Sequence, residues 1–165
     1  MSELSAAAVV LIDSAAWLLL HLAAAALTSR LPLSLFDPDG WLFRPRRWES
    51  GGEAYQGLFR VRSWKGILPD GAALSKSGFR KKRMVSRSPE YCRLFIKETC
   101  RAELFHWLVF ALAPLFYLWN EWRVATLMIP YALLANVPCI IAQRYNRPRL
   151  TRMLRIAGGS PHAAL

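Results

Sequence analysis

Apolar and polar residues follow one another along this chain in long blocks. Three apolar blocks cover residues 5–28, 104–119 and 124–142. A helix needs roughly 17–25 mostly apolar residues to cross a bilayer, so the first and third blocks are long enough. The second is slightly short, but Glu103 and Asn120 extend it to the polar layer at either end. The pattern predicts an all-α integral membrane protein with about three transmembrane helices.

A cleavable signal peptide is the alternative explanation of the first block. Such a peptide begins with positive charge and has an apolar core of about 7–15 residues. Here Glu3 stands where the positive charge belongs, and the apolar block is longer than that core. We therefore expect the first block to remain as a transmembrane helix, and residues 1–165 to form a single membrane domain.

The basic residues predict the orientation of these helices. The chain carries 22 Lys and Arg against 11 Asp and Glu, a formal net charge of +11. Because cytoplasmic segments carry the excess of Lys and Arg, the basic loop 29–103 and tail 143–165 are predicted to be cytoplasmic and the N-terminus outside. The apolar blocks exclude a soluble nucleic-acid-binding protein. We expect a multi-pass protein of the cell membrane that contacts membrane lipid and no nucleic acid.

Local signals divide the long loop. Gly51 and Gly52 predict a break in the chain. The stretch Leu58–Trp64 alternates apolar and basic residues, which predicts a short strand. A serine cap followed directly by proline predicts a helix that starts at Ser88 and continues without a breaker to Pro114.

That helix carries two polar groups before it becomes apolar. Glu98 falls on an apolar stripe, where an unpaired carboxylate is costly, and Arg101 is its expected partner three residues on. Thr99, Glu103 and His106 share the neighbouring face. A carboxylate that orients an imidazole makes it a better base, so Glu103 and His106 are a candidate catalytic pair. The alternative is a histidine that only forms structural hydrogen bonds at the membrane interface.

The third apolar block ends in a dense polar sequence, QRYNRPRL. Asn136 and Gln143 lie two turns apart on one helix face, beside prolines that favour a kink. An asparagine there either lines a cavity or binds a neighbouring helix. The arginines that follow form either an unordered patch for anionic lipid or a phosphate site of fixed geometry. They are Arg144, Arg147, Arg149, Arg152 and Arg155.

Polar residues inside the first block either bind another helix or have a direct function. Asp13 and His21 flank Trp17 at four-residue steps, and a hydrogen bond to another span is favoured over a direct function.

The three cysteines lack metal-ligand spacing, so no metal site is expected. The sequence also lacks the motifs of serine hydrolases, P-loop proteins and zinc hydrolases.

Three segments, in this order and spacing, resemble a known family. They are FRVRSWKGILPDGAAL (59–74), ETCRAELFHWL (98–108) and YALLANVPCIIAQRYNRPRLTRMLRI (131–156). Together with the apolar first block, they resemble the glycosyl-4,4'-diaponeurosporenoate acyltransferase family of bacterial carotenoid synthesis. The resemblance implies a membrane acyltransferase that moves a fatty acyl group from an activated donor onto a sugar hydroxyl of a glycosylated carotenoid or related glycolipid. It implies acyl-CoA or an acyl carrier protein as the donor, and no cofactor.

The implied reaction assigns roles to the candidate residues. Transfer to a hydroxyl needs a base, which we expect to be His106 oriented by Glu103, with Asp70 as the second candidate. A covalent route through Cys100 is less favoured, because Cys100 lies on the far side of the helix from Glu98. Arginines suit donor phosphates, and amide side chains suit the oxyanion. The expected substrate-binding residues are Trp64, Lys65, Glu98, Arg101, Asn136, Gln143, Arg144, Tyr145, Asn146, Arg147 and Arg149.

Composition alone allows a second class of protein. A small three-span chain with a basic cytoplasmic face also suits a non-catalytic accessory or scaffold protein of a lipid or carotenoid complex. Replacement of His106 discriminates the two classes, because only an enzyme would lose its product. Three helices bury little surface between them, so either class is compatible with a homo-oligomer or a complex with pathway enzymes.

Overall fold

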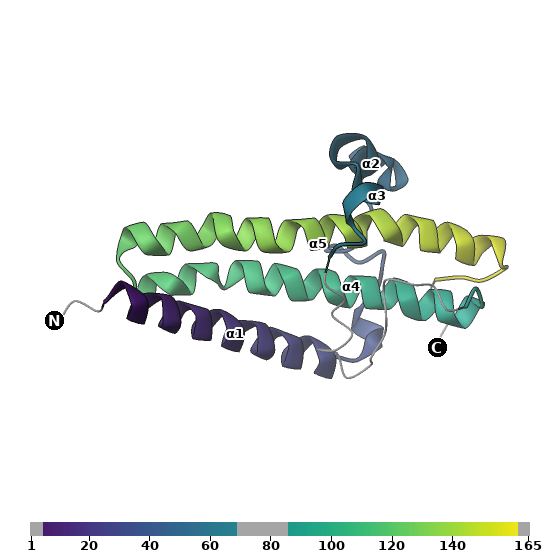
Figure 1. The fold of residues 1–165 in the computed structure, drawn as a ribbon. Helices are drawn as coiled ribbons and strands as arrows, with labels where there is room; N and C mark the ends of the chain where they lie inside the picture. Colours follow the sequence, from purple (N-terminus) through teal and green to yellow (C-terminus); the bar gives the residue numbers. More distant parts are fainter. Residues whose placement is uncertain (1–4, 69–85, 162–165) are drawn as a thin grey trace.

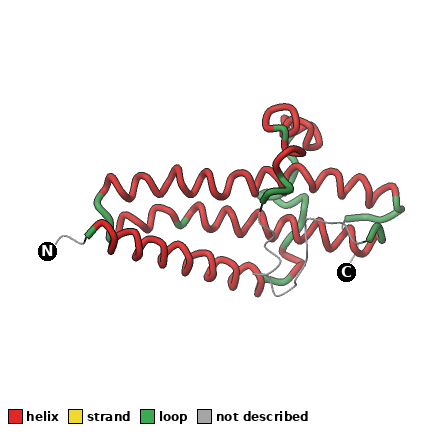
Figure 2. The backbone as a smooth tube through the Cα atoms, viewed as in Figure 1, coloured by secondary structure: helices red, strands yellow, loops and turns green. Residues whose placement is uncertain are grey.

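The computed structural model describes residues 5–68 and 86–161. Helices joined by turns and irregular segments make up this part of the chain, and it contains no strand (Figure 2). Three long helices, α1 (Ala6–Arg30), α4 (Pro89–Ala111) and α5 (Trp122–Ile156), lie side by side (Figure 1). The predicted all-α fold is confirmed.

Each long helix has the length and composition of a membrane span. α1, α5 and the unit formed by α4 with the 3₁₀ turn Ala113–Leu118 are long and apolar enough to cross a bilayer. α4 begins as predicted, because the Ser88 side chain accepts a hydrogen bond from the backbone N–H of Tyr91 at 3.2 Å. It ends three residues before Pro114.

Small side chains let the three helices approach one another closely. Ala24, Ala113 and Ala132 are buried in one cluster with Trp17 and Phe116, whose rings stack with their centroids 4.6 Å apart. Lipid is as apolar as these side chains, so the association of the helices depends on close packing. α1 packs against α4, and α4 forms the most extensive contact of the fold with α5.

α5 is longer than the apolar pattern predicts. The expected span ends at residue 142 and is followed by a basic tail, but the helix continues to Ile156. Arginine, leucine and methionine are good helix formers, and the helix accommodates Pro148 in this part. The sequence QRYNRPRL therefore lies on a regular helix, which fixes the direction of each side chain and favours fixed geometry over an unordered patch.

The predicted strand at Leu58–Trp64 is wrong. Two short helices occupy this region, α2 (Glu53–Phe59) and α3 (Val61–Trp64), and Arg60 between them has a left-handed backbone with φ 49°. Alternation over so few residues does not separate strand from helical turns, and an isolated strand has nothing to pair with. Both helices instead pack on Tyr145 of α5 and project from the side of the bundle (Figure 1).

The predicted break at the two glycines is confirmed. Gly51 has φ 64° and Gly52 has φ 92°, a region that side chains with a Cβ rarely adopt. A Cβ on Gly52 would also lie 3.1 Å from the carbonyl oxygen of Tyr145. Glycine here lets the chain turn into α2 while lying directly against α5.

A buried carboxylate joins α1 to the turn between α4 and α5. Asp13 is 5% exposed, and its Oδ1 accepts hydrogen bonds from Nε1 of Trp119 and Nδ2 of Asn120, both at 2.8 Å. The expected hydrogen bond from Asp13 to another part of the bundle is confirmed. Nδ1 of His21 instead lies 2.7 Å from the Trp17 carbonyl oxygen of its own helix.

Replacement of Asp13 by leucine is expected to destabilise the bundle. Asp13→Leu leaves the Trp119 and Asn120 donors without their acceptor, which should lower the free energy of unfolding by about 1–3 kcal/mol. Thermal unfolding of the protein in detergent measures this loss. Among the described residues, the exposed neighbour Ser14 bonds to Val10 of its own helix alone, so Ser14→Leu is the control and should leave the melting temperature unchanged. Equal melting temperatures for Asp13→Leu and the wild type would contradict the prediction.

Candidate active site

Glu103 is the centre of the polar end of the bundle. It is fully buried, with 0% of its surface exposed. Its Oε1 accepts a hydrogen bond from Nε of Arg144 at 2.7 Å, and its Oε2 accepts one from a terminal nitrogen of Arg147 at 2.6 Å. Trp107 also donates to Oε1 at 3.3 Å. One carboxylate of α4 therefore fixes two arginines of α5.

Arg144 connects this carboxylate to the loop that precedes α2. One terminal nitrogen donates to Oε1 of Glu49 at 2.6 Å, and the other donates to the carbonyl oxygen of Leu42 at 2.6 Å. With Nε bound to Glu103, every nitrogen of the guanidinium donates to an acceptor of the protein. Arg144 thus joins α5 to α4 and to two points of the loop.

Arg147 makes the equivalent connections one turn further along α5. Its Nε donates to Oγ1 of Thr99 at 3.0 Å, and one terminal nitrogen donates to the carbonyl oxygen of Phe43 at 2.7 Å. Only 2% of Arg147 is exposed. The shared helix face predicted for Thr99 and Glu103 is confirmed, because both side chains bind this guanidinium.

The two carboxylates and two guanidiniums form a neutral buried network. Removing four charges from water is costly, and only well-aligned, hydrogen-bonded partners offset that cost. Arg144 and Arg147 use their guanidiniums to hold the protein together, whereas the sequence suggested that they would face substrate phosphates. We refer to Glu49, Glu103, Arg144 and Arg147 below as the buried charge network.

Tyr55 completes the network from α2. Its hydroxyl donates to Oε1 of Glu49 at 3.0 Å. Burial, and then the negative charge of Glu49, raise the pKa of Tyr55 well above its ordinary value. The phenol therefore stays protonated at neutral pH and remains a donor to Glu49.

α3 meets the QRYNRPRL turns through two of the predicted residues. Nζ of Lys65 donates to Oδ1 of Asn146 at 2.8 Å and lies 4.8 Å from the ring centroid of Tyr145. Trp64 packs in the same cluster as Tyr145. Burial, followed by the positive charge of Arg149, lowers the pKa of Lys65. The structure thus brings together predicted residues that are some eighty positions apart in sequence.

Tyr145 is the apolar contact point of this region. The ring is buried, and the guanidinium carbon of Arg149 lies 3.7 Å from its centroid. The phenol oxygen accepts a hydrogen bond from Nε of Arg62 at 2.7 Å. Arg149 also donates to Glu53 at 2.7 Å, in an ion pair near the surface. Tyr145 and Arg149 therefore hold α2 and α3 against α5.

His106 lies one helical turn from Glu103, towards the apolar part of α4. Its Nδ1 is 2.9 Å from Oδ1 of Asn136, which is 2% exposed. Nδ2 of Asn136 donates to the Ala132 carbonyl oxygen at 2.9 Å. The structure gives His106 an orienting group on α5, whereas the spacing along α4 suggested Glu103, whose oxygens bind the arginines of the network.

The Asn136 amide also decides which nitrogen of His106 carries the proton. Because Nδ2 donates to Ala132, the atom that faces the imidazole is Oδ1, an acceptor. Nδ1 of His106 must then be the donor, and in the neutral ring Nε2 carries the lone pair. The arrangement can therefore hold a neutral imidazole with Nε2 as its basic atom.

The predicted ion pair of Glu98 with Arg101 is confirmed. Arg101 also donates to the carbonyl oxygen of Leu31 at 3.3 Å, and its guanidinium carbon lies 5.1 Å from the ring centroid of Phe36. These contacts fasten α4 to the chain that leaves α1. Cys100 is fully buried in the apolar cluster that contains Phe36.

Other site residues were missed or lie elsewhere. Sequence reasoning did not find Glu49, whose only signal is that it is an isolated acid after Arg44, Arg46 and Arg47. Gln143 lies half-buried on α5, two turns from Asn136. Asp70, the second candidate base, lies outside the described residues.

Comparison with known proteins identifies the family of this chain. Residues 39–156 match the family model of glycosyl-4,4'-diaponeurosporenoate acyltransferase. The glycosyl-4,4'-diaponeurosporenoate acyltransferases of Staphylococcus aureus strains MRSA252, N315 and bovine RF122 / ET3-1 are each 37% identical over 141 residues, which cover 85% of this chain and 84% of each relative. No solved structure matches the chain significantly. The matched region contains His106, Asn136 and the whole buried charge network, and the chain belongs to the glycosyl-4,4'-diaponeurosporenoate acyltransferase family.

Proposed function

We propose that this acyltransferase esterifies a fatty acyl group from an acyl thioester onto a sugar hydroxyl of a glycosylated carotenoid or related glycolipid. The relatives carry the name of a glycosylated carotenoid acid, which supports this class of acceptor. The apolar helices would hold the acyl chain and the polyene within the bilayer. The basic end of the bundle would face the cytoplasm, where thioester donors are made, with the N-terminus outside.

The pairing of His106 with Asn136 carries the catalytic proposal. Asn136 holds Nδ1 as the donor, so Nε2 of His106 carries the lone pair, which is the tautomer that a general base needs. His106 also lies where the apolar helices meet the buried charge network. A lipid-bound hydroxyl and a donor from the aqueous side would both reach this depth.

The reaction is a direct transfer. Nε2 of His106 takes the proton as the sugar oxygen attacks the thioester carbonyl, and a carbon–oxygen bond forms. The tetrahedral intermediate then collapses, the carbon–sulfur bond breaks, and the leaving thiolate receives the proton from the imidazolium. Gln143 and Asn146 remain candidate donors to the oxyanion, because the Asn136 amide is already bound to Ala132. Asp70 remains the second candidate base.

The remaining predicted residues position the helices around His106. Glu103 positions α5 through Arg144 and Arg147, so its contribution to catalysis is indirect. Trp64 and Lys65 hold α3 over QRYNRPRL, at the edge where a donor would enter. Further pathway enzymes or a second copy of the chain would cover exposed apolar faces of the bundle.

Replacement of His106 tests the base directly. His106→Gln should lower the transfer rate about 10²–10⁴-fold, because a glutamine cannot accept the hydroxyl proton. The measurement is mass spectrometry of the acylated product in cells that supply a glycosylated carotenoid, with equal amounts of each variant in the membrane. The control is His21→Gln, at a histidine that bonds within its own helix. Full activity of His106→Gln would reject this base, and Asp70→Asn would then be tested.

Replacement of Asn136 tests its positioning role. In Asn136→Asp, a carboxylate beside the imidazole favours the protonated ring, which is no longer a base. The acid limb of the profile of log kcat against pH should move to higher pH by about one unit. Asn136→Leu should lower kcat without this displacement. If both variants show only less folded protein and an unchanged pH profile, Asn136 has a structural role alone.

The buried charge network should control stability. Arg147→Ala leaves Glu103 with one cationic partner fewer in a buried site, which should cost about 3–5 kcal/mol and greatly lower the amount of folded protein. Arg123→Ala is the matched control, because Arg123 and its partner Glu121 are both exposed and surface pairs contribute about 0–1 kcal/mol. Unfolding in detergent measures both. A stable Arg147→Ala protein that fails only in donor binding would instead support a phosphate role for Arg147.

A further inference from the structure

A cationic pocket lies on the last turns of α5, beyond the buried charge network. It has a volume of about 280 Å³. One wall comes from the loop after α1 and the other from α5, and Arg147 lies at its inner side. The residues that line it include Asp39, Pro45, Pro148, Thr151, Arg152 and Arg155.

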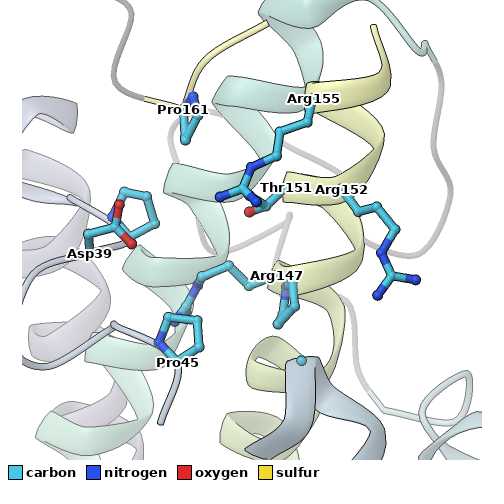
Figure 3. A pocket seen from close by; sticks show the side chains of 10 residues that line it. Asp39, Pro45, Arg147, Thr151, Arg152, Arg155 and Pro161 are labelled. Atoms are coloured by element: carbon cyan, nitrogen blue, oxygen red, sulfur yellow. The ribbon is translucent and has the colours of Figure 1, made fainter. Parts of the chain in front are cut away.

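Two arginines give this pocket its charge. Arg152 and Arg155 form no ion pair with any residue in the described part of the chain, whereas the charge of Arg147 is balanced by Glu103. Figure 3 shows Arg155 reaching from α5 over the pocket towards the side of Asp39, with Thr151 beside it. Arg152 leaves the helix on the side opposite to Arg155 and lines the other edge of the pocket. Asp39 is the single carboxylate among the lining residues.

The walls of the pocket are fixed before any ligand binds. The loop wall holds Pro38 and Pro45, and between them the carbonyl groups of Leu42 and Phe43 are bound by Arg144 and Arg147. The other wall is the regular helix α5. A preorganised site loses less entropy on binding, which favours recognition of a small charged group.

The pocket lies at a suitable distance from the candidate base. Asn136 and Arg147 are eleven residues apart on nearly the same face of α5, which is ~16 Å along the helix axis. In a coenzyme A thioester or a phosphopantetheine carrier, about thirteen bonds separate the inner phosphate from the sulfur, on the order of 15 Å when extended. Arg152 and Arg155 lie further along the helix, ~24 and ~28 Å from Asn136. A coenzyme A thioester with its inner phosphate at the near edge of the pocket, beside Arg147, would place its sulfur close to His106 and its outer phosphates towards Arg152 and Arg155.

We propose that this pocket binds the phosphate end of the acyl donor, with Arg155 and Arg152 as the ligands of the phosphates and Thr151 as a hydroxyl donor. The inference rests on the proposed acyl transfer and names its donor as a thioester of a phosphate-bearing carrier. Arginine forks match phosphate oxygens in geometry and charge. Phosphates of anionic lipid headgroups offer the same chemistry, so the test separates the two sources.

Binding of coenzyme A to purified protein tests the proposal without turnover. In nanodiscs of phosphatidylcholine, Arg152→Ala/Arg155→Ala should weaken binding of labelled coenzyme A at least tenfold, and Arg155→Lys should lose less. Pantetheine, which lacks the phosphates, should bind the wild type at least tenfold more weakly than coenzyme A. The control Arg30→Ala removes the same charge from an exposed position that does not line the pocket, and should bind like the wild type.

The outcomes are distinct. Equal binding by the double variant and the wild type would overturn the proposal, and so would equal affinity for pantetheine and coenzyme A. Adding phosphatidylglycerol to the nanodiscs tests the lipid source. If this lipid displaces coenzyme A from the wild type, the pocket belongs to lipid headgroups and the donor assignment is wrong. His106→Gln should bind coenzyme A normally, so a failure of the catalytic proposal leaves this result intact.

Discussion

The fold depends on one buried carboxylate, Glu103. Without it, two arginines of α5 would lose their shared partner, and Thr99 would be the one remaining hydrogen-bond acceptor on α4 that these arginines reach among the described residues. Helices in lipid gain little from the hydrophobic effect against each other, so specific polar contacts decide how such helices are aligned. Glu103 fixes the register of α5 against α4, and that register places Asn136 opposite His106.

The network also explains why the polar sequence begins where the apolar helix ends. Charged side chains at this depth need partners that leave few donors without acceptors. QRYNRPRL supplies guanidiniums on one face, towards Glu103 and Glu49, and supplies Tyr145 and Asn146 to α3. The arginines of α5 therefore divide into two groups: Arg144, Arg147 and Arg149 bind acceptors of the protein, and Arg152 and Arg155 line the pocket further along the helix.

The sequence predicts the helices well because their signals are local. The apolar blocks, the Ser88 cap and the Glu98–Arg101 pair each depend on residues within a few turns. Contacts with residues far away in the chain are predicted poorly from the sequence. The spacing of three residues allows Glu103 to contact His106 on the same helix. In the structure, however, both oxygens of Glu103 accept hydrogen bonds from Arg144 and Arg147 of α5. Likewise, Leu58–Trp64 forms helices because Tyr145 offers a surface to pack on.

The order of the network along the chain has a consequence for biogenesis. Glu49 and Glu103 are synthesised before Arg144 and Arg147, so both carboxylates emerge without the cations that will neutralise them. Until the last helix is made, Glu49 and the carbonyl groups of Leu42 and Phe43 lack the arginines that bind them in the folded protein. Synthesis of α5 then supplies both cations, so a chain interrupted after Ala142 would contain the two carboxylates and neither of their arginine partners.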